Sequence, residues 1–125
     1  MKAQDLMIGD WVLCDGKPYR VAEIGGMVCL DYEKELFAVL EDIEPIPLTA
    51  KILEKNRFKK DAGGEECWAC KIGWFTPHEY NKKFIPVSWE VEICGDPNSF
   101  DGVIKYVHEL QHALRLCGIK KEIEL

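Results

Sequence analysis

Apolar and polar side chains alternate through the middle of the chain, from about residue 67 to residue 94. Two sets carry the pattern: Trp68, Cys70, Ile72 and Trp74, and then Val87, Trp89, Val91 and Ile93 with Ser88, Glu90 and Glu92 between them. Successive side chains of a strand point to opposite faces, so a period of two indicates a strand. The sequence therefore predicts strands at about 67–75 and 84–94 in an antiparallel sheet, with each apolar set on one face.

A helical period replaces this alternation near the end of the chain. At 100° per residue, one apolar stripe is formed by Val103, Val107, Leu110, Leu114 and Cys117. The stripe predicts a long helix over 103–117 that covers the sheet, with Asp101 as its N-cap. Gly118 followed by Ile119 favours a Schellman-type helix ending, and a short final strand is expected at 121–125.

The first 47 residues predict a different arrangement, in which short strands follow one another through tight turns. Asp15-Gly16 is a strong signal for a two-residue hairpin. Short strands joined by compact turns are typical of a small barrel. We therefore predict an SH3-like β-barrel over residues 1–47.

A proline-rich stretch at 44–47 divides the chain into two parts. After it, Thr49 suits the N-cap of a short helix over 50–56. These elements together predict an α+β fold that is mainly β. Its N-terminal part is the small barrel, and in residues 48–125 the antiparallel sheet packs against the one long C-terminal helix.

Composition and charge narrow the classes of function. The 125 residues are 47% hydrophobic, enough for a packed core, and their net charge is −6. A negative balance disfavours nonspecific nucleic-acid binding, which depends on neutralising phosphates. No apolar run is long enough to span a bilayer, and the first ten residues lack the apolar segment of a secretory signal. We expect a cytoplasmic protein that binds neither nucleic acid nor membrane.

The six cysteines are expected to be reduced thiols, because disulfides are rare in the cytosol. Cys67 and Cys70 form a C-x-x-C motif, which suits half of a zinc site or a redox pair. Positions i and i+3 of a strand point to opposite faces, however, so these two thiols could not hold one metal there. Both are predicted to be buried or half-buried free thiols.

One motif points to catalysis. His108, Glu109 and His112 spell H-E-x-x-H, which on a helix provides two zinc ligands and a glutamate base. The two histidines are predicted to share the polar face of the helix, where both are at least partly exposed. A zinc-dependent hydrolase that uses these three residues is therefore one alternative function.

Ligand chemistry argues against that alternative. A catalytic zinc needs three protein ligands, and His78 is the only other histidine in the sequence. Lys105 and Arg115 flank the histidine pair on the predicted helix, and two cations repel a dication. We therefore expect no metal, no cofactor and no catalytic residue.

Two resemblances add to these expectations. The stretch IGDWVLCDGKPYRVAEI at 8–24 resembles the opening hairpin of SH3-like barrels in translation factors of the elongation factor P type. It implies a barrel, and it leaves an RNA- or ribosome-associated module as a second alternative. The blocks DLMIGDWV at 5–12, IEPIPLTAKILEKN at 43–56 and KYVHELQHALRLCGIKKEIEL at 105–125 extend over most of the chain. With them the chain resembles a family of small uncharacterised proteins from gut bacteria and their phages and prophages.

The family resemblance implies no activity, substrate or cofactor. We predict a non-enzymatic accessory or interaction protein of the cytoplasm. The resemblance implies an origin in a phage or another mobile element, and the expected partner is a protein.

Overall fold

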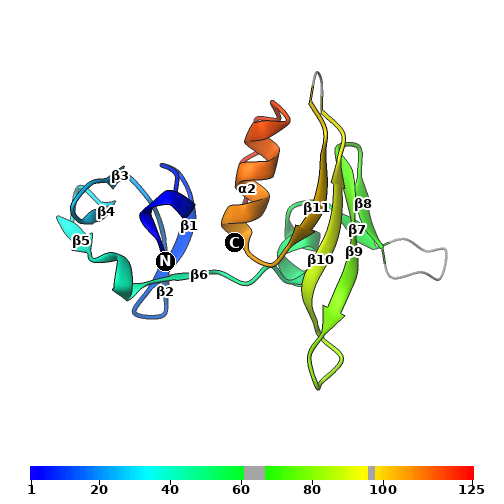
Figure 1. Ribbon diagram of the computed structural model, residues 1–125, viewed down its shortest axis with the longest axis horizontal. Coiled ribbons are helices and arrows are strands. Elements are labelled where there is room, and N and C mark those ends of the chain that lie inside the picture. Colours follow the sequence, from blue (N-terminus) through cyan, green and yellow to red (C-terminus); the bar gives the residue numbers. More distant parts are fainter. Residues whose placement is uncertain (61–66, 96–97) are drawn as a thin grey trace. The chain divides into compact units, whose positions relative to one another are not determined.

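The computed structural model describes residues 1–60, 67–95 and 98–125, which form two compact units (Figure 1). The first unit is Met1–Ile46 with Tyr106–His108, and the second is Pro47–Lys105 with Glu109–Leu125. The strands of both units pair in antiparallel fashion. The fold is therefore mainly β with a helix near the C-terminal end, which confirms the coarse fold prediction.

Short strands build the first unit. They are β1 (Trp11–Cys14), β2 (Lys17–Arg20), β3 (Glu23–Ile24), β4 (Val28–Asp31), β5 (Leu36–Ala38) and β6 (Ile43–Pro45), with 3-10 turns η1 (Ala3–Asp5) and η2 (Leu40–Asp42). They form two three-stranded sheets, ordered β2-β1-β6 and β3-β4-β5. No backbone ladder joins the two sheets within residues 1–46, so the strands do not close into the expected SH3-like barrel.

The β1–β2 hairpin turns through Asp15 and Gly16, as the sequence predicts. Both residues have positive φ, +52° and +75°, which a two-residue type I′ turn requires. The proline-rich stretch contains a strand that the sequence did not predict, because Pro45 of β6 lies opposite Val12 of β1. β6 is an edge strand, and an edge tolerates proline, which has no N–H to donate to a ladder.

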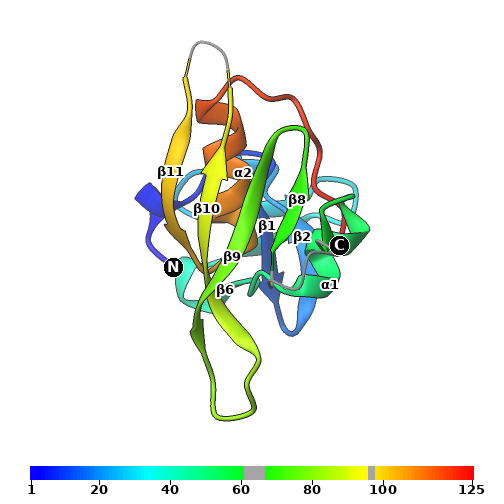
Figure 2. The same cartoon turned by 90° about the vertical axis from the view of Figure 1, so that its right-hand side faces the viewer.

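The second unit is organised around a five-stranded sheet with the order β11-β10-β9-β8-β7. Its elements are α1 (Ala50–Lys55), β7 (Lys59–Lys60), β8 (Trp68–Cys70), β9 (Gly73–Tyr80), β10 (Pro86–Ile93), β11 (Phe100–Ile104) and α2 (Val107–Leu116). Figure 2 shows that the β9–β10 hairpin extends well beyond the ends of β8 and β11. This extension leaves the turn of the hairpin, residues 81–85, away from the neighbouring strands.

The predicted strand over 67–75 is two strands joined by a turn. Cys70 at the end of β8 pairs with Gly73 at the start of β9, so the chain reverses through Lys71 and Ile72. The reversal breaks the alternation between the two halves of the segment. Trp68 is buried at 5% exposure whereas Trp74 is 39% exposed, so the prediction that they share one apolar face was wrong.

Strand β10 confirms the predicted alternation from Trp89 onward but departs from it at its start. Register shifts on either side of Ser88 mark a β-bulge, and an extra residue in a strand exchanges its inner and outer positions. Ser88 is therefore fully buried, and its hydroxyl donates to Glu79 at 3.4 Å. Val87 is 43% exposed, contrary to the prediction that it lies with the apolar set.

Helix α2 begins at Val107, four residues later than predicted, because the preceding residues form β11. Val103 pairs with Glu90 and Asp101 with Glu92 across the sheet. Asp101 is therefore a strand residue and not the N-cap, and Val103 is 46% exposed. From Val107 the predicted stripe is confirmed, since Val107, Leu110, Leu114 and Cys117 are all buried.

The ends of the two helices also follow the sequence. The Thr49 hydroxyl accepts a hydrogen bond from the Ile52 N–H at 3.2 Å, which is the predicted N-cap of α1. At the end of α2, Gly118 has a φ of +70° and the Ile119 N–H donates to the Leu114 carbonyl at 2.9 Å. This is the bond that defines a Schellman motif.

The last residues form no strand, in contrast to the prediction for 121–125. They are instead held to the end of α1. The Asn56 side chain donates to the Glu124 carbonyl at 2.7 Å and accepts from the Glu124 N–H at 2.8 Å. Ile123 is 1% exposed. Its buried side chain and the two hydrogen bonds between Asn56 and Glu124 therefore hold the tail in place of the expected strand.

Candidate functional site

The H-E-x-x-H residues have three different environments. His108 is 6% exposed and its ring stacks on that of Tyr106, with 5.8 Å between centroids. His112 is half-buried. The prediction that both histidines are at least partly exposed was therefore wrong for His108, because the buried side of α2 extends beyond the apolar stripe to His108 and the polar Gln111.

The carboxylate of Glu109 has a backbone partner. Its Oε1 accepts the N–H of Lys105 at 3.0 Å, just before the first turn of α2. A glutamate in the first turn that reaches back to a free N–H stabilises a helix start, as in a capping box. This contact gives Glu109 a structural role at the start of α2, so a catalytic role is not needed to explain its presence.

The other histidine of the sequence does not join the helical pair. His78 lies on β9, where its Nδ1 is 3.3 Å from Oε1 of Glu90. Within residues 1–60, 67–95 and 98–125, no group of three or more His, Cys, Asp or Glu side chains is placed to hold a metal ion. A third ligand for the helical histidine pair is thus not provided by this part of the chain.

The cysteines are free thiols in three kinds of environment: Cys14, Cys29 and Cys117 are buried, Cys67 and Cys70 are half-buried as predicted, and Cys94 is exposed. Burial raises the pKa of the Cys117 thiol, and nearby Cys94 raises it further. Burial, with Asp15 and Asp42 nearby, likewise raises the pKa of Cys14. A raised pKa lowers the thiolate fraction, so neither thiol is prepared for nucleophilic attack.

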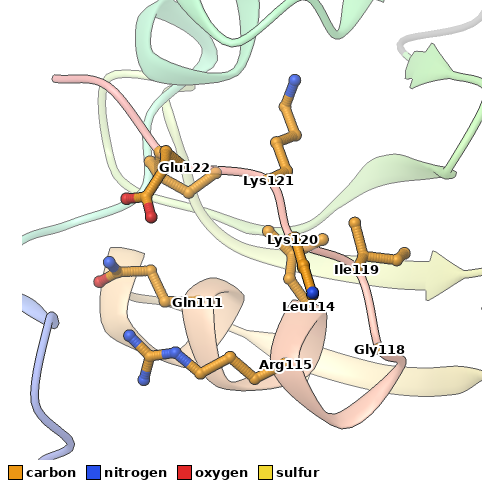
Figure 3. A pocket seen from close by; sticks show the side chains of 9 residues that line it. Gln111, Leu114, Arg115, Gly118, Ile119, Lys120, Lys121 and Glu122 are labelled. Atoms are coloured by element: carbon orange, nitrogen blue, oxygen red, sulfur yellow. The ribbon is translucent and has the colours of Figure 1, made fainter.

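A pocket of about 440 Å³ lies between the end of α2 and the C-terminal tail (Figure 3). In that view the polar ends of Gln111, Arg115 and Glu122 lie on one side, and Lys121 turns away from them. Lys121 instead places its Nζ 5.8 Å from the Phe58 ring centroid. Gln111, Arg115 and Glu122 each already interact with neighbouring groups, so the polar residues on that side of the pocket are already used by the fold.

A second concave site lies on the outward face of the five-stranded sheet, near its β11 edge. This acidic groove, of about 230 Å³, is lined by Trp74, Thr76, Glu90, Val91, Glu92, Asp101, Gly102 and Val103. Strand pairing explains why they meet. Trp74, Glu92 and Asp101 form one row across β9, β10 and β11, and Thr76, Glu90 and Val103 form the next. Directly opposite residues share a face, so both rows face outward.

Acidic side chains dominate the electrostatics of the groove, with the Nδ1 of His78 beside one of them, Glu90. Glu92 and Asp101 are directly opposite each other, an arrangement of like charges that destabilises a sheet. Glu90 stands in the adjacent row, and no lysine or arginine of the described residues lines the groove. Beside these carboxylates, Trp74 and Val103 expose 39% and 46% of their surface. The groove thus offers carboxylates and an indole ring together, which are the groups that attract a cation attached to an apolar body.

Part of this groove is predictable from the sequence. The alternation of 84–94 predicts Glu90 and Glu92 on a wet face, and the pairing confirms it. Trp74 was not predicted to face outward, because the turn before β9 reverses the strand. Asp101 and Val103 were not predicted in the groove, because both were assigned to the helix. The signal for β11 was weak, since Val103 also fits the helical stripe.

Comparison of the chain with protein-family models, with curated proteins and with solved structures found no match. Among the described residues, none of the helices is both long and apolar enough to cross a membrane. The geometry of the groove and the chemistry of the residues around it are therefore the basis for a function.

Proposed function

We propose that this chain is a non-enzymatic interaction protein that binds a basic, partly apolar segment of a partner protein in the acidic groove. The observation that carries the proposal is the row Trp74, Glu92 and Asp101, in which two opposed carboxylates lie beside an exposed indole. A cationic side chain between Glu92 and Asp101 relieves their repulsion, and its apolar stem covers Trp74.

The ordinary explanation of this surface is a solvated sheet face. Antiparallel sheets commonly keep one polar face toward water. Two features favour a binding role over that explanation: the like charges are paired across strands instead of being separated, and Trp74 and Val103 leave apolar area exposed beside them. Exposed apolar area rimmed by charge is typical of interaction sites.

Binding in the groove is tested by titrating the protein with a synthetic peptide that alternates Lys and Phe, with Trp emission as the signal. We expect saturable binding that weakens as salt is added, because the contacts are partly ionic. The double variant Glu92→Gln/Asp101→Asn is expected to bind roughly three- to tenfold more weakly, since exposed ion pairs each contribute modestly.

Two controls assign the signal to the groove. Trp74→Phe should remove most of the emission change, because Trp68 and Trp89 are buried and Trp11, on β1, does not line the groove. A peptide of the same length with Glu in place of Lys should not bind. Equal affinity of wild type and double variant, or equal affinity for both peptides, would show that the groove is not the binding site.

For the first unit we retain the SH3-like arrangement as a proposal, supported by its short antiparallel strands and type I′ hairpin. We also propose a cytoplasmic location, to which the net charge of −6 and the six free cysteines are suited. A phage or mobile-element origin stays a proposal that rests on the family resemblance.

A further inference from the structure

The turn of the β9–β10 hairpin presents an aromatic side chain that the fold does not use. Phe84 is 86% exposed, and Tyr80, Ile85 and Val87 near it are 46%, 51% and 43% exposed. Lys82 and Lys83 precede it and are exposed as well. We call residues 81–85 the hairpin tip. It joins two cations to an apolar anchor at the end of an extension of the sheet (Figure 2).

Hydrogen bonds hold the hairpin tip in one conformation. Oδ1 of Asn81 accepts from the N–H groups of Lys83 and Ile85, at 2.9 and 3.1 Å. The Asn81 backbone accepts from the Phe84 N–H at 3.0 Å and donates to the Ile85 carbonyl at 2.9 Å. Four bonds to one residue fix the turn, so its side chains are presented with little conformational entropy left to lose on binding.

The backbone conformation at Phe84 is one that phenylalanine does not favour, so this residue type does not stabilise the turn. Its φ is +59°, in the left-handed region that favours glycine or asparagine. Because the ring is exposed, no free energy of burial offsets the cost of this backbone conformation. An aromatic residue held in an unfavourable conformation and in water is typical of a binding anchor.

The hairpin tip has the chemistry that the acidic groove lacks. The tip carries two lysines and a phenyl ring, and the groove carries three carboxylates beside Trp74 and Val103. We propose that the groove accepts the hairpin tip of a second copy of this chain. This inference rests on the proposed function, because it names the basic, apolar segment that the groove binds.

The spacing of tip and groove permits a closed dimer. Six residues separate Phe84 from Glu90, which sets an upper limit of about 20 Å on their spacing at about 3.3 Å per residue. Two copies related by a twofold axis, with their outward sheet faces opposed and antiparallel, place each tip over the other copy's groove. Such an interface repeats the same contact twice, as in most symmetric dimers.

Net charge opposes this association but does not dominate it. Each copy carries −6, and copies of like charge repel. At about 0.15 M salt the screening length is about 8 Å, so distant charges contribute little, whereas contacts between lysine and carboxylate persist. We expect a dimer that is weak, that forms at high protein concentration and that is lost when either charge set is reversed.

A charge-exchange experiment tests the dimer by sedimentation equilibrium over a concentration series. The tip variant is Lys82→Glu/Lys83→Glu and the groove variant is Glu92→Lys/Asp101→Lys. In a dimer of either variant, the tip and the groove carry charge of the same sign at both contacts. The dimer dissociation constant of each variant should therefore rise at least tenfold. An equimolar mixture restores attraction at both contacts, and it should dimerise at least as well as wild type. Phe84→Asn should also weaken the dimer and leave the groove intact.

Three outcomes overturn the inference. They are a wild type that stays monomeric at the highest concentration, a dimer that neither variant weakens, and a mixture of the two variants that does not associate. The Lys/Phe peptide separates these failures from failure of the proposed function. If Phe84→Asn still binds the peptide with an affinity sensitive to Glu92 and Asp101, the groove binds another protein's basic segment and only self-association is wrong.

Discussion

The backbone at Phe84 has a conformation that costs energy for any residue with a bulky side chain, and the ring is 86% exposed. We therefore predict that Phe84→Asn leaves the free energy of unfolding unchanged or raises it by up to about 1 kcal/mol, because asparagine adopts positive φ more readily. Urea denaturation followed by circular dichroism measures this change.

The matched control is Phe75→Ala on β9. Phe75 is fully buried and packs edge-on against Phe58, with ring centroids 4.7 Å apart. Its loss should cost about 3–5 kcal/mol through cavity formation. A destabilisation by Phe84→Asn comparable to that of Phe75→Ala would show that Phe84 stabilises the fold, and its role as a binding anchor would lose its main argument.

The sequence predicts a hydrogen bond from a polar side chain to the backbone only where the two partners are close along the chain. The motif suggested a catalytic role for Glu109, whereas its carboxylate accepts the Lys105 N–H. Asn56 was the expected last residue of a helix, and its amide holds Glu124 near the C-terminal end. Thr49 was predictable because its partner Ile52 is three residues away. The partner of Asn56 is far along the chain, so no local pattern indicates it.

At the scale of elements, the boundary between β11 and α2 shows why a correct period gave a wrong helix start. Val103 and Val107 are four residues apart and fit one helical stripe by spacing alone. Pairing with β10 decides the conformation of Val103, since five residue pairs join β10 and β11. Strand pairing depends on residues distant in sequence, whereas the capping of α2 by Gly118 is local and was predicted.

The buried face of α2 gives a test within a single helix. Leu110 is 1% exposed and Leu116 is 59% exposed. Leu110→Ala should lower the free energy of unfolding by about 2–5 kcal/mol, because it leaves a cavity. Leu116→Ala should change it by no more than about 0.5 kcal/mol. Similar losses for the two variants in urea titrations would contradict the orientation of α2 described here.

At the scale of the whole molecule, net charge conceals a separation of charge within the second unit. The chain carries −6 in total, yet Lys82 and Lys83 stand together at one turn while Glu90, Glu92 and Asp101 surround one groove. The sequence alone gives the sum and the charges along each strand. It does not show that β11 places Asp101 opposite Glu92. This pairing gathers the carboxylates of the solvent-facing side of the sheet into an acidic groove.

The most direct test of the proposed function maps the groove residue by residue. Backbone amide shifts of the Phe84→Asn variant are recorded by NMR while the Lys/Phe peptide is added. We predict that the largest shifts fall on groove residues, among them the indole N–H of Trp74. The full set is Trp74, Glu90, Glu92, Asp101 and Val103. The absence of shifts in these residues at saturation, or a response centred on His108, Glu109 and His112, would contradict it.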